Sequence, residues 1–201
     1  MPEQSIYMVS IVIMYLIGSI SSSILIARLL NLPDPRGLGS GNPGATNMLR
    51  TGSKKAAVFT LVGDLLKSLI PLLIAQYFGF ELFALCLMGL AAIIGHMYPI
   101  YYQFRGGKGV ATTVGVLLAI NWQLALSWGV IWLITAMVTR FSSLAAIVAT
   151  ISLPVVAYFL NLPTYLLLTT VAIVVLVIWR HQSNIRNLLS GKEDKIGAKH
   201  Q

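Results

Sequence analysis

Residues 95–109 read GHMYPIYYQFRGGKG, and this polar stretch lies between two long apolar runs. Its second half sets glycines beside cations: Arg105, Gly106, Gly107, Lys108 and Gly109. Crossing a bilayer requires no such combination. Glycine, which has no side chain, lets backbone N–H groups approach an oxyanion closely, and adjacent cations add attraction. The stretch therefore predicts a loop that grips a phosphate or acyl-phosphate group at a membrane surface.

The loop has two alternative interpretations, a nucleotide-binding P-loop and a basic loop that only fixes topology. A nucleotide-binding P-loop, G-x-x-x-x-G-K-[ST], would need glycine where Tyr102 stands and Ser or Thr where Gly109 stands, so that motif is absent. A basic loop that only fixes membrane topology stays open as the simpler alternative. The anion-binding interpretation is favoured because topology accounts for the cations but not for the clustered glycines.

Composition places the chain among integral membrane proteins. Of its 201 residues, 57% are hydrophobic and 10% charged, whereas a soluble domain carries roughly 25% charged residues. The net charge of +8 would suggest nucleic acid in a soluble protein. Here the cations sit in short loops between apolar runs, which indicates topology and anionic lipid or phosphate ligands instead. The single cysteine, Cys86, lies in an apolar run and excludes a disulfide framework.

The apolar runs predict an all-α integral membrane protein, a polytopic bundle forming one membrane domain over residues 1–201. The run at 110–138 is ambiguous, because one helix of roughly 29 residues would reach more than about 40 Å, beyond a hydrocarbon core of about 30 Å. Splitting it at Asn121, with the N-terminus outside, puts every loop that holds Lys or Arg on the cytoplasmic side. The prediction is seven transmembrane helices with a cytoplasmic C-terminus: 6–30, 56–80, 82–94, 110–120, 121–138, 142–160 and 165–179. The first run follows Glu3 with no basic residue before it, so we expect it to stay as a membrane helix and not to be a signal peptide.

Three polar stretches end on the cytoplasmic side in this topology: residues 31–55, 95–109 and the tail 180–201. We expect them to converge and form the active site. The first contains GSGNPGATNMLR, residues 39–50. It offers neutral hydrogen-bonding groups, open backbone and one cation that can bind phosphate bidentately: Ser40, Asn42, Thr46 and Asn47; Gly39, Gly41 and Gly44; and Arg50. A helix that begins near Ala45 would add a favourable partial charge. An ordinary turn between membrane helices is the alternative.

The tail begins RHQSNIRNLL, residues 180–189, directly after an apolar run. We expect a helix that continues into the interface, with His181 and Asn184 on one face. His181 can orient a phosphate or act in acid–base chemistry. A basic interfacial helix that binds anionic headgroups is an equal alternative.

Several other polar residues lie near the same surface. Asp64 and Lys67 are three residues apart inside an apolar run, so they share a helix face and can pair. His96, Ser142 and Ser143 are weaker candidates. Neither His96 nor His181 has an aspartate at the fifth position, and no G-x-S-x-G or H-E-x-x-H motif occurs. The sequence has no cluster of His, Cys and carboxylates that would hold a metal, so we expect none.

The three polar stretches together resemble the signatures of the acyl-phosphate-dependent glycerol-3-phosphate acyltransferases (PlsY type) of bacterial membranes. The matching segments are GSGNPGATNMLR, GHMYPIYYQFRGGKGVATTVG and RHQSNIRNLLSGKEDKIG, in the same order and spacing over the whole chain. One departure is Gln182-Ser183, where the family pattern has a basic residue after the histidine.

The resemblance implies a seven-helix enzyme of the bacterial cytoplasmic (inner) membrane, with its active site facing the cytoplasm and no cofactor. It would transfer a fatty acyl group from acyl phosphate to the 1-hydroxyl of glycerol 3-phosphate, giving lysophosphatidic acid and inorganic phosphate, the first acylation of phospholipid synthesis. A soluble enzyme that makes acyl phosphate is an implied partner, and nucleic acid is not. The residues at the positions of the family's catalytic and substrate-binding groups are Ser40, Arg50, Lys108, Ser142, His181 and Asn184.

Two questions stay open at the level of sequence. The general base is His181, His96 or the phosphate of the substrate itself. A phosphate or phospholipid transporter is the alternative class of protein, but no inverted repeat is evident and the polar residues crowd one surface instead of the midplane.

Overall fold

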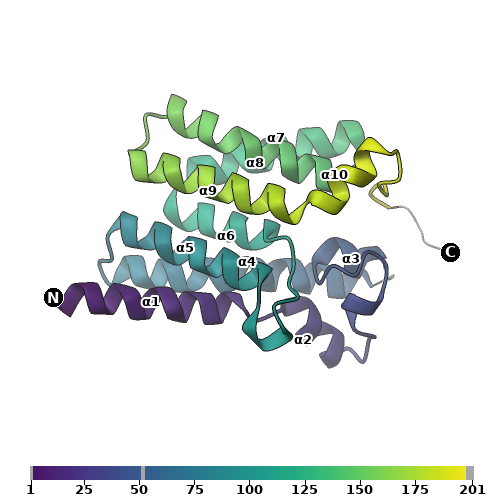
Figure 1. Ribbon diagram of the computed structural model, residues 1–201, viewed down its shortest axis with the longest axis horizontal. Helices are drawn as coiled ribbons and strands as arrows, with labels where there is room; N and C mark the ends of the chain where they lie inside the picture. Colours follow the sequence, from purple (N-terminus) through teal and green to yellow (C-terminus); the bar gives the residue numbers. More distant parts are fainter. Residues whose placement is uncertain (1, 51–52, 198–201) are drawn as a thin grey trace. The chain divides into compact units, whose positions relative to one another are not determined.

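The computed structural model describes residues 2–50 and 53–197, and every regular element in that part of the chain is a helix. Backbone contacts divide the chain into two compact units, the first ending at Ile120 and the second beginning at Asn121. Each unit has its own set of packed helices, which Figure 1 labels in chain order.

The first unit contains the longer set of helices. Its described elements are α1 (Pro2–Gly18), α2 (Ser22–Leu29), η1 (Pro35–Gly37), α3 (Ala45–Arg50), α4 (Lys54–Tyr77), α5 (Leu82–Met97), η2 (Ile100–Tyr102) and α6 (Val110–Ile120). Helix α1 packs along α5, α4 packs along α6, and α2 and α3 lie against α4 (Figure 1). Ala27, Met48, Ala56 and Ala57 form a small apolar core where α2, α3 and α4 meet. This core fixes both ends of the loop between α2 and α4.

Close helix packing in this unit depends on glycine. A Cβ at Gly18 would collide with the carbonyl of Ala92, and one at Gly95 would collide with the carbonyl of Tyr15. The backbones of α1 and α5 are therefore in direct contact, as small residues allow in membrane helices. Because Gly95 opens the polar stretch 95–109, the contact anchors the start of that stretch on α1.

The second unit contains α7 (Trp122–Thr139), α8 (Ser142–Phe159), α9 (Thr164–Arg180) and α10 (Gln182–Leu189). Helix α8 packs against both α7 and α9, and the short α10 touches α8 and α9. Trp128 Nε1 donates to Thr150 Oγ1 at 3.1 Å, so the polar atom of a buried indole is satisfied between α7 and α8. The unit is a layered helical bundle whose C-terminal segment folds back on α8.

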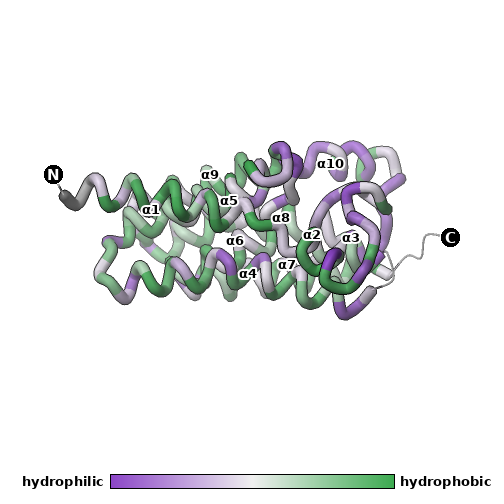
Figure 2. The backbone as a smooth tube through the Cα atoms, turned by 90° about the horizontal axis from the view of Figure 1, so that it is seen from below, coloured by the Kyte–Doolittle hydropathy of each residue, from purple (hydrophilic) through white to green (hydrophobic). Residues whose placement is uncertain are grey.

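Length and composition mark four helices in the described residues as candidate membrane spans: Lys54–Tyr77, Leu82–Tyr102, Trp122–Thr139 and Ser142–Phe159. Two bent pairs raise the count to six if each pair is one span, and α6 is a shorter apolar helix. Helix α7 is one example of an exposed apolar face: Leu126, Leu133 and Met137 are all exposed, as expected for a face toward lipid. Figure 2 shows hydrophobic colour along α1 and α5 and hydrophilic colour in the loops near α2 and α3. The count of seven spans and their orientation stay predictions.

The first predicted span, 6–30, is not one continuous helix, and this corrects the sequence expectation. Helices α1 and α2 meet at an angle of 42° across residues 19–21. Serine hydroxyls make local hydrogen bonds at the break: Ser19 Oγ donates to the carbonyl of Tyr15 at 2.8 Å, and the hydroxyls of Ser21 and Ser23 lie 3.1 Å apart. Such bonds compete with the helical ladder.

The predicted split at Asn121 is confirmed. Helix α6 ends at Ile120, and Asn121 caps α7 because its Oδ1 accepts the N–H of Leu124 at 2.9 Å. Helix α3 begins at Ala45, the position considered in the sequence for a helix start in the first loop. The tail, however, does not continue α9 in a straight line: α9 and α10 meet at 63°, with His181 at the bend.

Candidate active site

Asn47 organises the first glycine-rich loop. Its side chain is 1% exposed. Its Nδ2 donates to the carbonyls of Pro35 (2.8 Å) and Leu38 (3.0 Å), and its Oδ1 accepts from Ser40 N (3.0 Å) and Ser40 Oγ (3.2 Å). The loop is thus wrapped around one amide group, and both amide hydrogens have backbone partners. Asn47, predicted to bind phosphate, here holds the loop that presents Ser40.

Glycine is required beside this amide. Gly39 has φ +53° and Gly41 has φ +68°, a region that L side chains rarely adopt. A Cβ at Gly39 would also lie 2.5 Å from Asn47 Oδ1. The remaining predicted residues of the loop surround this turn: Asn42 and Gly44 are half-buried, Thr46 is exposed and Arg50 is half-buried at the end of α3.

Arg36 joins the first loop to the second. Its guanidinium binds the carboxylate of Asp34 through two nitrogens, with Nη2 2.6 Å from Oδ2 and Nε 3.0 Å from Oδ1. Hydrogen bonding from Arg36 lowers the pKa of Asp34. The same guanidinium lies over the Tyr102 ring, 5.9 Å from its centroid. Sequence reasoning counted Arg36 only as a topological cation, although Asp-Pro-Arg is a turn sequence that indicates a local role.

The second loop is pressed against His96. Gly107 N donates to the His96 carbonyl at 3.1 Å. A Cβ at Gly106 would collide with that carbonyl, and a Cβ at Gly107 would collide with Nε2 of the ring. Lys108 is half-buried and Arg105 exposed. After Gly109, with φ +80°, helix α6 begins, and its N-terminus adds a favourable partial charge for an anion.

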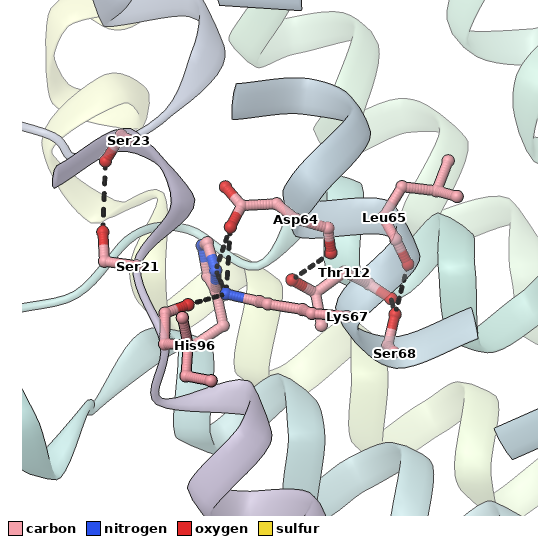
Figure 3. Close-up of polar contacts among 9 residues, drawn as sticks. Ser21, Ser23, Asp64, Leu65, Lys67, Ser68, His96 and Thr112 are labelled. Atoms are coloured by element: carbon pink, nitrogen blue, oxygen red, sulfur yellow. Dashed lines mark hydrogen bonds and ion pairs between the residues drawn. The ribbon is translucent and has the colours of Figure 1, made fainter. Parts of the chain in front are cut away.

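Asp64, Lys67 and His96 form a buried polar cluster behind this loop (Figure 3). The predicted pair of Asp64 and Lys67 is confirmed, with Nζ 2.9 Å from Oδ1. Their side chains are 4% and 7% exposed. Lys67 Nζ also lies 2.9 Å from His96 Nδ1 and donates to the carbonyl of Ile20 at 2.6 Å. The cluster therefore links α4 and α5 to the break between α1 and α2.

A separate group of predicted residues meets in the second unit, around a carboxylate that sequence reasoning missed. Glu193 Oε1 accepts from Ser143 Oγ at 2.6 Å and from Asn184 Nδ2 at 2.7 Å. The backbone around it is tied to the turn between α7 and α8, where Ile196 N donates to the carbonyl of Arg140 at 2.7 Å. The scarcity of acidic residues, 6 in the whole chain, was the available signal that one in the tail has a partner.

His181 lies at the bend between α9 and α10 and is 2% exposed. Its Nδ1 is 2.8 Å from the carbonyl of Val177. Because a carbonyl only accepts, Nδ1 carries hydrogen and Nε2 is the basic nitrogen of the neutral ring. Asn184 Oδ1 is buried and has no hydrogen-bond partner among the described residues. Ser142, by contrast, is half-buried at the start of α8, one residue before the hydroxyl that binds Glu193.

The predicted site residues therefore fall into two groups. Residues 31–50 and 95–109 lie together in the first unit with the cluster of Asp64, Lys67 and His96; Ser143, His181 and Asn184 belong to the second. That the three stretches join in one site stays a prediction. Within residues 2–50 and 53–197, no group of three or more His, Cys, Asp or Glu side chains is arranged to hold a metal ion.

This fold is that of an integral membrane acyltransferase. It matches two crystal structures described as PlsY, an integral membrane glycerol 3-phosphate acyltransferase. The glycerol 3-phosphate form gives a TM-score of 0.89 at 41% identity, covering 95% of this chain and 96% of that one. The lysophosphatidic acid form gives 0.87 at 40%, covering 95% of each chain.

The sequence comparisons agree with the structural ones. The family model for glycerol-3-phosphate acyltransferase matches residues 8–191. Glycerol-3-phosphate acyltransferases from Thioalkalivibrio sulfidiphilus and Neisseria meningitidis are 51% and 47% identical to the chain. The first match covers 92% of this chain and 91% of the relative, and the second 94% and 97%. The chain belongs to the glycerol-3-phosphate acyltransferase family.

Proposed function

We propose that this acyltransferase moves a fatty acyl group from acyl phosphate to the 1-hydroxyl of glycerol 3-phosphate at the cytoplasmic face of the bacterial inner membrane. The products are lysophosphatidic acid and inorganic phosphate, and a soluble enzyme that forms acyl phosphate supplies the donor. The observation that carries the proposal is the second loop. There two glycines are packed against His96. This packing holds Lys108 next to the N-terminus of α6, where the cation and the helix end both favour an anion.

The chemistry balances without a cofactor. The hydroxyl oxygen of glycerol 3-phosphate attacks the carbonyl carbon of acyl phosphate, a new C–O ester bond forms, and the bond from that carbon to the phosphate oxygen breaks. The hydroxyl proton passes to a base and ends on the released phosphate. Because acyl phosphate is already activated, the enzyme can act by positioning both substrates and by stabilising charge on the carbonyl oxygen and the leaving group.

The cations of the first unit suit the two phosphate groups. Arg50 and Lys108 are both half-buried, so their charges act in a lower dielectric than bulk water. Ser40, held by Asn47, adds a hydroxyl from the first loop. We assign these three to binding phosphate and to stabilising the leaving group, with Arg105 and Thr46, both exposed, contributing at the entrance.

The arrangement of the two histidines supports His181 over His96 as the protein base. His181 donates from Nδ1 to a carbonyl, which leaves Nε2 as the basic nitrogen. His96 Nδ1 already faces the ammonium of Lys67. Asn184 Oδ1, a buried acceptor with no partner among the described residues, can receive a substrate hydroxyl hydrogen. Proton transfer to the phosphate of glycerol 3-phosphate itself is the second candidate route.

Phosphate release tests the proposal and separates an enzyme from a transporter. Purified protein in lipid nanodiscs is mixed with palmitoyl phosphate, with and without glycerol 3-phosphate, and inorganic phosphate is measured over time. We expect release only when glycerol 3-phosphate is present. No release, or the same release without the acceptor, would refute acyl transfer. Uptake of labelled glycerol 3-phosphate into sealed proteoliposomes without phosphate release would favour the transporter.

A further inference from the structure

The contacts of Lys67 define one protonation pattern in the buried cluster behind the second loop. An ammonium has three hydrogens and no acceptor. Lys67 Nζ has two hydrogen-bonding partners, His96 Nδ1 at 2.9 Å and the Ile20 carbonyl at 2.6 Å, and it forms an ion pair with Asp64 Oδ1 at 2.9 Å. Because the ammonium of Lys67 can only donate, His96 Nδ1 is the unprotonated nitrogen in this contact. The proton of the neutral ring is on Nε2.

This pattern also balances charge. One carboxylate, one ammonium and one neutral imidazole sum to zero, which a buried site tolerates far better than a net charge. The carboxylate is needed because it keeps Lys67 charged, and the charged lysine is needed because only an ammonium obliges Nδ1 to accept. Asp64 acts on His96 mainly through Lys67, since its own oxygen is 3.6 Å from Nδ1.

The opposite edge of the same ring meets the glycine-rich loop. A Cβ at Gly107 would collide with His96 Nε2, and the Gly107 amide donates to the carbonyl of His96 at 3.1 Å. The loop thus rests on the histidine at two points, ring and backbone. Gly107 packs closely against the ring, and Lys108 is the next residue in the chain.

We propose that Asp64, Lys67 and His96 are a positioning cluster for the phosphate-binding loop. Lys67 fixes His96 in its Nε2–H form, the fixed ring sets the backbone of Gly106 and Gly107, and that backbone sets the place of Lys108. We assign all three a positioning role, so that they affect binding of glycerol 3-phosphate through the loop. The inference rests on the proposed function for its substrate, but the state of the ring is independent of it.

Nuclear magnetic resonance of the histidine rings tests the first link. Protein labelled with ¹⁵N-histidine is placed in nanodiscs at pH 7.5, and the His96 signals are identified by their loss in His96→Gln. We expect the pure Nε2–H form in the wild type and a mixture of ring forms in Lys67→Met. A wild-type ring protonated on Nδ1, or a ring unchanged in Lys67→Met, would overturn the proposal.

A double-mutant cycle tests the second link, from ring to loop. We expect His96→Ala and Gly107→Ala each to raise KM for glycerol 3-phosphate about tenfold, with a smaller change in kcat. Removing the ring makes room for the Cβ, so the double variant should be no worse than the poorer single variant. Multiplied effects, about 100-fold in KM, would show that ring and loop act independently and would contradict the proposal. Gly129→Ala, where a Cβ meets nothing within 4 Å, is the matched glycine control.

Two further variants distinguish positioning from simple support of the fold. His96→Gln keeps a hydrogen-bonding group near Nε2 and should recover part of the KM lost in His96→Ala. Asp64→Asn with Lys67→Met removes both charges together and folds without a buried unpaired ion, yet it should still raise KM because Nδ1 has lost its donor. A normal KM in that double variant would overturn the proposal.

The two claims fail in different ways. A wild type that transfers no acyl group refutes the proposed function and removes the substrate from this inference, while the ring measurement still supports or overturns the link from Lys67 to His96. An active wild type with an independent, multiplicative cycle refutes the positioning cluster and leaves acyl transfer standing.

Discussion

Two half-buried cations, Arg50 and Lys108, belong to the two glycine-rich stretches, and each stretch is fixed by a buried side chain. Both hydrogens of the Asn47 amide bond to backbone carbonyls of the first loop. The carbonyl and the ring of His96 pack against the second loop. Rigid supports of this kind keep charged groups in place before substrate arrives, so that no reorganisation is needed during reaction. The chemistry at the scale of single residues is therefore electrostatic.

Removing either cation should cut turnover strongly. We expect Arg50→Ala and Lys108→Ala each to lower kcat/KM by about 100-fold or more, the order seen when one charge-stabilising contact is removed. Lys55→Ala, an exposed cation at the start of α4, is the matched control and should keep near-normal activity. Steady-state phosphate release measures all three. Near-normal turnover in both loop variants would contradict the proposal that Arg50 and Lys108 bind phosphate.

Asn47 should matter for the shape of the loop. Asn47→Asp keeps an acceptor for Ser40 but loses both donors and turns a carboxylate toward the carbonyls of Pro35 and Leu38. Each buried carbonyl left without its donor costs about 1–3 kcal/mol. We expect a lower Tm in thermal unfolding and faster proteolysis within residues 31–53. A variant with wild-type Tm and an equally protected loop would contradict this role.

The breaks between helices expose backbone groups that polar side chains then bind. The break after Gly18 frees the Ile20 carbonyl, which Lys67 then binds. The bend between α9 and α10 has His181 at its junction. Backbone groups released by a break inside a membrane must find partners within the protein. Polar side chains at these breaks consequently become part of the functional architecture.

The cap at Asn121 should stabilise α7 without affecting the catalytic rate. Asn121→Ala removes the acceptor for the Leu124 N–H, and loss of such a cap costs about 0.5–2 kcal/mol. We expect a lower Tm with kcat and KM unchanged at 20 °C. Asn121→Asp keeps an acceptor and should retain the wild-type Tm. Equal loss in both variants would mean that the side chain serves another purpose.

Sequence predicted the boundaries that depend on local signals and missed those that depend on distant partners. The split at Asn121 follows from the length of the apolar run, the pairing of Asp64 with Lys67 follows from their spacing, and both are confirmed. The break at 19–21 could not be predicted from hydropathy, because it is stabilised by serine hydroxyls and by a lysine far along the chain. Glu193 was missed for the same reason: its partner Ser143 is 50 residues away.

At the scale of the whole molecule, family and fold are shown, and topology is the part that stays predicted. The positive-inside rule puts the turn after α4 outside and the end of α10 in the cytoplasm. In a Cys86→Ala background, Gln76→Cys should react with a membrane-impermeant maleimide on intact spheroplasts, and Ser190→Cys only after permeabilisation; both positions are exposed. The reverse pattern would overturn the topology and the cytoplasmic active site.

The identity of the acyl donor is the most direct test of the central claim. Purified protein is incubated with glycerol 3-phosphate and, in turn, palmitoyl phosphate, palmitoyl-CoA or palmitoyl-acyl carrier protein, and lysophosphatidic acid is measured by mass spectrometry. Loops built to grip phosphate predict lysophosphatidic acid from palmitoyl phosphate alone, with one inorganic phosphate released per product. Product formed equally well from palmitoyl-CoA, or none from palmitoyl phosphate, would contradict the account.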